Sequence, residues 1–237
     1  MSSWRVRFLF VLCTACLLAA VISCDLIMAV VDQRDHGDEE PAYRISAGNS
    51  HSLIITEDGG IFTSGWNYYG QLGTGSRSDE HAPVEIEVPA VQAAAASNQH
   101  SLFLLEDGSL LAAGRNFNGQ LGLGDTSSSE PDPEEVNVSD VQAISAFTQY
   151  SMIIKDDGTL WATGGNDSGQ LGLGDKENRS TFEMVKENVA AVAAGNNHTL
   201  IVTTDGVLMA SGKNNHGQLC LGHDDNKSTF TKIDLPL

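Results

Sequence analysis

The chain has 237 residues, of which 41% are hydrophobic and 19% charged, and its formal net charge at pH 7 is −18. A chain this acidic is a poor partner for nucleic acid or for an anionic lipid surface, because both repel negative charge. Its four cysteines show no zinc-binding spacing, and we expect neither a metal nor another cofactor.

The N-terminus has the pattern of an export signal. Arg5 and Arg7 precede the apolar residues 8–22, and the run from Val21 to Cys24 resembles the cleavage site of bacterial lipoproteins. We therefore expect residues 1–23 to be a lipoprotein-type signal peptide and Cys24 to carry lipid. Residues 24–40 follow as an acidic linker, and removing the two arginines with the signal changes the net charge from −18 to −20.

Two alternatives stay open at this end of the chain. The apolar residues 26–31 would extend the segment into an uncleaved membrane anchor, although Asp25 interrupts it at a place where a charge is costly. If Cys24 carries no lipid, it could pair with Cys220 in a disulfide. In either form the chain is expected to be exported and held at the extracytoplasmic face of a membrane.

Residues 41–237 repeat one pattern four times. A Gly-Gln-Leu turn recurs with its glutamine at Gln71, Gln120, Gln170 and Gln218, so the units are about 49 residues long. Three further landmarks keep the same order in every unit: a ring residue, an Asp-Gly pair and a Gly-x-Asn. They are His51, His100, Tyr150 and His198; Asp58, Asp107, Asp157 and Asp205; and Asn67, Asn116, Asn166 and Asn214.

Each unit predicts four short antiparallel strands. The apolar residues 52–56 and 61–64 flank the first Asp-Gly pair, a strong hairpin signal if both central residues have positive φ. An alanine-rich run precedes each later ring residue, and a more polar run closes each unit. Four strands in about 50 residues are typical of a β-propeller blade. We expect an all-β domain over residues 41–237, with blades at about 41–88, 89–138, 139–187 and 188–237.

These landmarks resemble the RCC1 repeat, named for the regulator of chromosome condensation. The first unit reads Ala-Gly-Asn-Ser-His-Ser-Leu from Ala47, Glu-Asp-Gly from Glu57 and Gly-Trp-Asn-Tyr-Tyr-Gly-Gln-Leu-Gly from Gly65. The resemblance implies a propeller of seven blades, whereas four are present. The chain is then a fragment of a longer protein, an incomplete open propeller or a sector completed by another chain, and we favour the open propeller for this chain alone. Cys220 also departs from the repeat, since it takes the place of Gly73.

The function predicted from these features is a non-enzymatic protein–protein interaction module. The ring residues recur at one place in each unit, which spreads them around the array and favours a structural role. Trp66, Tyr68, Tyr69 and Phe117 cluster just before the first two turns and are candidate anchors for a protein partner, with packing between blades as the alternative. An envelope enzyme inhibitor is a second function to weigh, and self-association a further expected property. The resemblance also implies guanine-nucleotide exchange on a small GTPase, which the export signal and acidic charge disfavour.

Overall fold

The computed structural model describes residues 42–126 and 129–236, and this part of the chain is built from strands. The predicted signal peptide, the predicted lipidation site Cys24 and the whole acidic linker lie outside the described residues. The described part contains no helix that is long and apolar enough to cross a membrane.

The strands form four separate sheets of four, each antiparallel and in chain order. Blade 1 contains β1 (Arg44–Ala47), β2 (His51–Ile55), β3 (Ile61–Gly65) and β4 (Glu80–Ile86). Blade 2 contains β5 (Val91–Ala96), β6 (His100–Leu105), β7 (Leu110–Arg115) and β8 (Ser129–Val136). Blade 3 contains β9 (Val141–Phe147), β10 (Tyr150–Lys155), β11 (Leu160–Gly164) and β12 (Arg179–Lys186). Blade 4 contains β13 (Val189–Ala194), β14 (His198–Thr203), β15 (Leu208–Gly212) and β16 (Lys227–Lys232).

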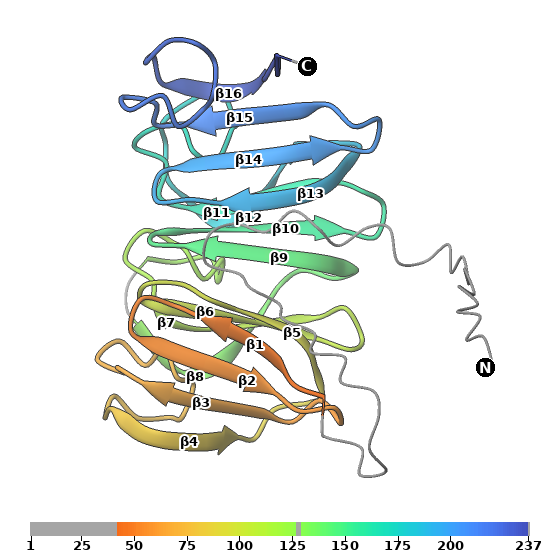
Figure 1. The fold of residues 1–237 in the computed structure, drawn as a ribbon. Coiled ribbons are helices and arrows are strands. Elements are labelled where there is room, and N and C mark those ends of the chain that lie inside the picture. The colour runs from red at the N-terminus through yellow and green to blue at the C-terminus, as the bar shows by residue number, and fades with distance from the viewer. Residues whose placement is uncertain (1–41, 127–128, 237) are drawn as a thin grey trace, which may run out of the picture.

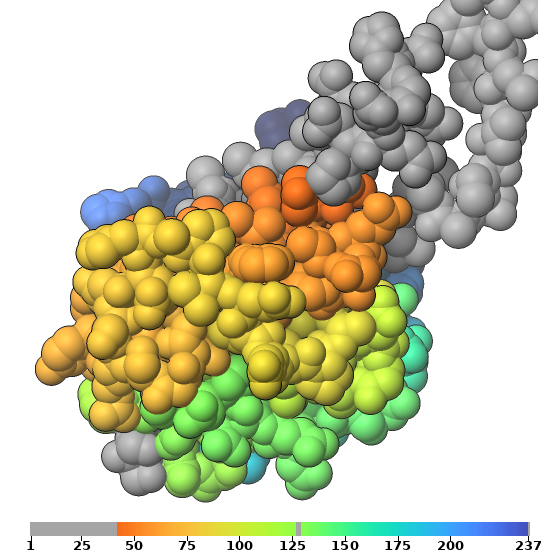
Figure 2. Space-filling view, turned by 90° about the horizontal axis from the view of Figure 1, so that it is seen from below, coloured from red at the N-terminus to blue at the C-terminus, as the bar shows by residue number. Residues whose placement is uncertain are grey.

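Consecutive blades meet along their first strands. β5 contacts β1 and β9, and β13 contacts β9, so these strands line the inner side of the array. The blades follow one another through the molecule, with β4 at one end and β16 at the other (Figure 1). From the β4 end, blade 1 presents a continuous orange-to-yellow surface, and the blue residues of blade 4 are seen only at the margin (Figure 2). The all-β, four-blade open propeller expected from the sequence is confirmed.

The Asp-Gly turns differ in one respect from the prediction. Only the glycine has a positive φ, which is +81° at Gly108, while Asp107 keeps an ordinary backbone. The Asp107 carboxylate instead accepts hydrogen bonds from Ser109 N at 2.9 Å and Ser109 Oγ at 2.6 Å. The aspartate therefore stabilises a longer turn with its side chain, and two positive-φ residues are not needed. The same hydrogen bonds lower the pKa of the Asp107 carboxyl.

One glycine in each blade is required by a close approach of backbone. Gly114 pairs with His100 across the sheet and has φ +106°. A Cβ atom there would lie 2.5 Å from the Gln99 carbonyl oxygen. The Gly-x-Asn landmark thus begins with glycine because any side chain would push the ring-bearing strand away.

The hydrophobic core lies between the blades. Leu53 and Ile55 of blade 1 share one buried cluster with Phe103 of blade 2. Blades 2 and 3 share a second cluster and blades 3 and 4 a third. The fourth cluster contains only Ala210, Leu219 and Ile233, all from blade 4. Each blade is therefore stabilised mainly by its neighbour, as expected for a repeat protein.

Candidate functional site

The Gly-x-Asn and Gly-Gln-Leu landmarks together build one rigid turn in each blade. In blade 1, Asn67 Oδ1 accepts a hydrogen bond from Leu72 N at 2.9 Å, and Asn67 Nδ2 donates to the Ser76 carbonyl at 3.1 Å. Gln71 Oε1 accepts from Tyr69 N at 3.0 Å. Both amides are buried, so the turn positions the residues between them as a fixed platform. The glutamine thus satisfies a backbone N–H group of the turn.

The platforms of blades 1 and 2 carry an aromatic cluster. Trp66 and Tyr68 stack with ring centroids 6.1 Å apart and an interplanar angle of 8°. Tyr69 packs edge-on against Tyr68 at 5.0 Å and against Phe117 at 6.1 Å. These are the favourable stacked and edge-to-face arrangements of aromatic pairs. The structure therefore brings together all four residues that the sequence suggested as anchors.

Arg115 is a fifth member of this cluster that the sequence interpretation missed. Its guanidinium lies 5.5 Å from the Tyr69 ring centroid and 5.2 Å from that of Phe117, close enough for cation–π attraction. The guanidinium also donates to the Gln99 side-chain oxygen. A signal was present in the repeat, because Arg115 occupies the place of Trp66 one unit later.

The cluster divides into a packed part and an exposed part. Tyr69 of blade 1 is half-buried between Phe117 and Arg115 of blade 2, so it contributes to the contact between the two blades. Tyr68 is 64% exposed and Phe117 is 48% exposed. Tyr69 therefore packs the seam between blades, as the second alternative expected, whereas Tyr68 and Phe117 face solvent.

The turn does not need an aromatic residue at the exposed position. Tyr68 and Phe117 have Asp167 and Asn215 as their equivalents in blades 3 and 4, and both of these are exposed. The hydrogen bonds of the turn are the same in all four blades, since Leu171 N donates to Asn166 Oδ1 at 3.0 Å just as in blade 1. Folding alone therefore does not account for two large apolar rings in solvent.

An open cleft lies beside this aromatic cluster. Its lining consists of Trp66 and four polar residues, Asn49, Ser50, Asn98 and Gln99. The cleft crosses from blade 1 to blade 2 and presents amide groups next to an indole ring. An apolar wall with a few fixed polar groups is the usual composition of a recognition surface.

The ring residues lie in the seams between blades. His51 Nε2 is 2.9 Å from Ser101 Oγ of the next blade, and Ser101 Oγ donates to the Gln71 carbonyl at 2.7 Å. Because the serine hydrogen goes to that carbonyl, the imidazole nitrogen is the donor to Ser101. The same relay runs from His100 through Ser151 to the Gln120 carbonyl, with distances of 2.9 and 2.7 Å.

Burial keeps these rings uncharged. Desolvation lowers the pKa of His51 to about 4 and that of His100 to about 3. Burial also raises the pKa of the Tyr150 hydroxyl, which lies 3.1 Å from Thr199 Oγ1 of blade 4. His51, His100 and Tyr150 each bond the next blade and lie in successive seams, so these three rings have a structural role in this fold.

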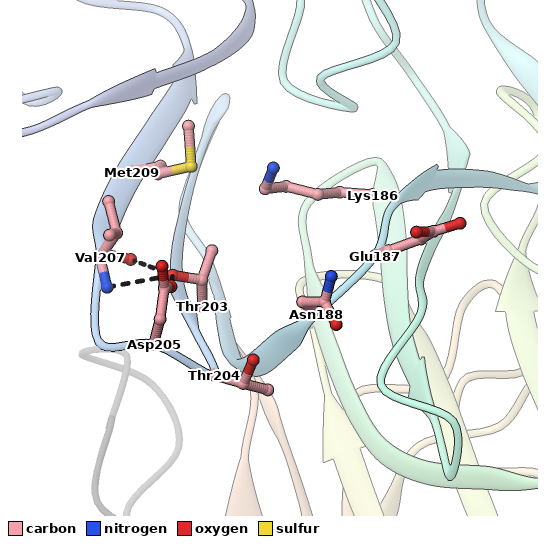
Figure 3. A pocket seen from close by; sticks show the side chains of 8 residues that line it. All are labelled: Lys186, Glu187, Asn188, Thr203, Thr204, Asp205, Val207 and Met209. Carbon is pink, nitrogen blue, oxygen red and sulfur yellow. Dashed lines mark hydrogen bonds between the residues drawn. The ribbon is translucent and has the colours of Figure 1, made fainter.

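A second cleft lies between the end of β12 and the β14–β15 turn of blade 4. Figure 3 shows Lys186, Glu187 and Asn188 on one side and Thr203, Asp205 and Val207 on the other. Thr203 Oγ1 donates to the Val207 carbonyl at 3.2 Å and accepts from Val207 N at 3.0 Å, and it also bonds the Asp205 carboxylate. Thr203, Asp205 and Val207 thus satisfy each other within an ordinary Asp-Gly turn. Among residues 42–126 and 129–236, no group of three or more metal-ligating side chains is placed to hold an ion.

The chain consists of four-stranded antiparallel sheets that repeat, and each sheet shares a hydrophobic core with the next one. This arrangement defines a repeat protein of the β-propeller class. The model of the regulator of chromosome condensation (RCC1) repeat matches residues 58–104, 107–154 and 157–202. A second model of the same repeat matches residues 43–71, 91–120 and 189–218. The chain belongs to the RCC1 repeat family.

Known proteins match this chain over parts of their length. The ultraviolet-B receptor UVR8 of Arabidopsis thaliana is 39% identical over 46 residues, which are 19% of this chain and 10% of the receptor. The E3 ubiquitin-protein ligase highwire of Drosophila melanogaster is 37% identical over 49 residues, or 21% of this chain and 1% of the ligase. Each match is about one repeat long.

Two solved structures show the same fold. Yeast RCC1 (Prp20) bound to Kap60 matches with a TM-score of 0.74 and 23% identity, covering 82% of this chain and 49% of that one. Human WBSCR16 matches with a TM-score of 0.73 and 23% identity, covering 82% of this chain and 52% of that one. The chain spans about half the length of these structures.

Proposed function

We propose that this protein is a non-enzymatic module that binds a protein partner through the exposed aromatic surface of blades 1 and 2. This surface is formed by Trp66, Tyr68, Phe117 and Arg115 with the adjoining cleft at Asn98 and Gln99. One observation carries the proposal: the solvent-facing rings of Tyr68 and Phe117 occupy positions where equivalent turns have Asp167 and Asn215. Aromatic and arginine side chains are the residues that most often supply binding energy at protein interfaces.

The proposal includes display on the extracytoplasmic side of a membrane. Its support is the sequence alone: the Arg5 and Arg7 region, the apolar residues 8–22 and the lipoprotein-like site ending at Cys24. Lipid on Cys24 would tether the propeller through the acidic linker. In a bacterial host, intact-mass spectrometry should show a lipid mass on the mature chain that is lost in Cys24→Ala. An unsubstituted mature chain whose mass equals that of its amino acids alone would contradict the lipid anchor.

Yeast RCC1 (Prp20) binds Kap60, Gsp1p and histones. Those partners are not transferred to this chain, because its N-terminus predicts export. An inhibitor of an envelope enzyme fits the same aromatic surface, since an inhibitor is also a protein-binding module. The partner's identity then decides between the two.

The test is a capture experiment with the tagged full chain and an envelope fraction of its host. Tyr68→Ala combined with Phe117→Ala should abolish retention of the partner and leave the melting temperature unchanged, because both rings are exposed. Tyr43→Ala is the matched control. Tyr43 is 48% exposed, as Phe117 is, but it directly precedes β1 and lies away from the cluster. Partner retention that survives the double substitution would refute this surface as the binding site.

A further inference from the structure

The three seams between blades use one repeated set of contacts. The ring of the earlier blade reaches the Ser or Thr hydroxyl that follows the ring in the later blade. The last glycine of the Gly-Gln-Leu turn donates its N–H to the final strand of the later blade, as from Gly75 to the Pro131 carbonyl at 3.0 Å and from Gly124 to the Ser180 carbonyl at 2.8 Å. Each blade thus has a trailing face that offers a ring and a turn, and a leading face that offers a hydroxyl and a strand.

Blade 4 presents a trailing face without a covering blade. We define this face by His198, Leu200, Val202, Leu208 and Cys220. Leu200 and Leu208 are half-buried, whereas all their equivalents in the other blades are fully buried. The His198 ring makes no hydrogen bond to any residue of the described chain. Gly217 and Gly222 have no atom within 4 Å of a virtual Cβ.

Blade 1 presents the opposite half of the same contact set. We define its leading face by Ile45, Ser52, Ile54, His81 and Pro83. Ile45 is 42% exposed, whereas its equivalent Ala94 in the seam between blades 1 and 2 is 8% exposed. Ser52 is exposed and occupies the position of Ser101, the residue that accepts from a ring. Within residues 42–126 and 129–236, the array therefore has an unpaired apolar face at each end, and the two faces are complementary in kind.

Cys220 identifies which leading face fits. It keeps the glycine conformation with φ +56°, and its equivalents Gly122 and Gly172 pack on phenylalanines of the next blade. A Cβ at Gly122 would lie 2.7 Å from the Phe182 ring, and one at Gly172 would lie 2.4 Å from the Phe230 ring. Cys220 thus excludes a leading face with phenylalanine at this place.

A proline at the same place leaves more room. At Gly73 a Cβ would lie 3.0 Å from the ring of Pro133, a contact that a shift of a few tenths of an ångström relieves. Proline at this position occurs in blades 1 and 2 only, as Pro83 and Pro133. Because blade 1 already covers Pro133, Pro83 belongs to the one leading face in the described chain that is both open and compatible with Cys220.

We propose that the trailing face of blade 4 binds the leading face of blade 1 of a second copy of this chain. The contact continues the blade-to-blade packing: His198 would donate to the Ser52 hydroxyl, Gly222 N to the His81 carbonyl, and Leu200 would pack near Ile45 and Ile54. Such a head-to-tail contact is heterologous, so each copy uses a different face. It does not depend on the aromatic surface proposed above for partner binding.

The test compares two blocking substitutions in the full chain by sedimentation velocity with a reductant present, because Cys220 is exposed and would otherwise form disulfides. Cys220→Arg blocks the trailing face without changing the backbone strain at that residue. Ile45→Arg blocks the leading face. Met184→Arg is the matched control, since Met184 is 43% exposed on β12 of blade 3 and lies on neither face.

We expect the unchanged chain and Met184→Arg to form a dimer or larger assembly, and each blocking variant alone to be a monomer. An equal mixture of the two blocking variants should restore a complex of two chains, because each variant keeps the face that the other has lost. Since each copy carries a net charge of −18, added salt should strengthen the association by screening repulsion. The proposal is overturned if the unchanged chain is monomeric, if both blocking variants still associate, or if their mixture stays monomeric.

Discussion

Removing the Ser151 hydroxyl tests whether the ring relay holds adjacent blades together. Ser151 is buried, accepts from His100 Nε2 at 2.9 Å and donates to the Gln120 carbonyl at 2.7 Å. In Ser151→Ala the buried imidazole N–H has no acceptor, which costs about 1–3 kcal/mol, and the carbonyl loses a donor as well. We expect a loss of about 2–3 kcal/mol in the free energy of unfolding, or roughly 4–12 °C in melting temperature at about 2–4 °C per kcal/mol.

Ser52→Ala is the matched control for this prediction. Ser52 holds the same place in blade 1 but is exposed, with no preceding blade in the described chain to supply a ring. Its removal should change the unfolding free energy by less than about 0.5 kcal/mol. Urea unfolding followed by both circular dichroism and tryptophan fluorescence measures the difference and checks that blades unfold together. Equal losses in the two variants would refute the relay as a stabilising contact.

Further predictions concern pH, backbone strain and the aromatic surface. Burial lowers the pKa of His51 to about 4 and that of His100 to about 3. The two neutral rings therefore contribute their full share to the free energy of unfolding above about pH 6.5, the pKa of histidine in the unfolded chain. This stabilisation is lost as pH falls below 6.5, each ring contributing up to about 1.4 kcal/mol per pH unit in urea titrations. Cys220→Gly should stabilise by about 1 kcal/mol because φ is +56°. Gly172→Cys should lower the free energy of unfolding by about 2–4 kcal/mol, because the new Cβ would meet the Phe230 ring. If Cys220→Gly and Gly172→Cys changed stability in the same direction and by a similar amount, the backbone and packing argument would be wrong. Tyr68→Ala should leave the melting temperature within about 2 °C, since a surface change is worth under about 0.5 kcal/mol, at about 2–4 °C per kcal/mol.

The repeated landmarks were sufficient to predict the blades. Four Gly-Gln-Leu turns at nearly constant spacing fix the number of units, and the apolar runs on either side of each Asp-Gly pair coincide with paired strands such as β6 and β7. The turn type was predicted wrongly because Asp107 acts through its carboxylate, which a rule based on φ alone does not consider. Local signals therefore located the elements better than they described the turns.

The contacts between blades could not be read from one repeat. Ser101 follows His100 in the chain, yet it bonds His51 of the preceding blade, because the array places equivalent positions of neighbours face to face. The aromatic residues were proposed as a group, but their division into a packed Tyr69 and an exposed Tyr68 depends on Arg115 of the next blade. These contacts depend on how neighbouring blades are placed relative to each other, and the sequence alone does not give that placement.

Equivalent positions in the four blades act as an internal set of substitutions. Where all four agree, as with the asparagine that bonds Leu72 N and its counterparts, the residue serves the turn itself. Where one blade differs, the difference reports its surroundings: Cys220 has a glycine-like backbone conformation in the turn of blade 4, which no following blade covers in the described part of the chain. The four described blades form three seams, so among the described residues one trailing and one leading face remain. Cys220 lies on the free trailing face and Pro83 on the free leading face. Because Cys220 fits against proline but not against phenylalanine, the two ends of this array are complementary to each other, whereas the seam of blades 2 and 3 and that of blades 3 and 4 pair glycine with phenylalanine.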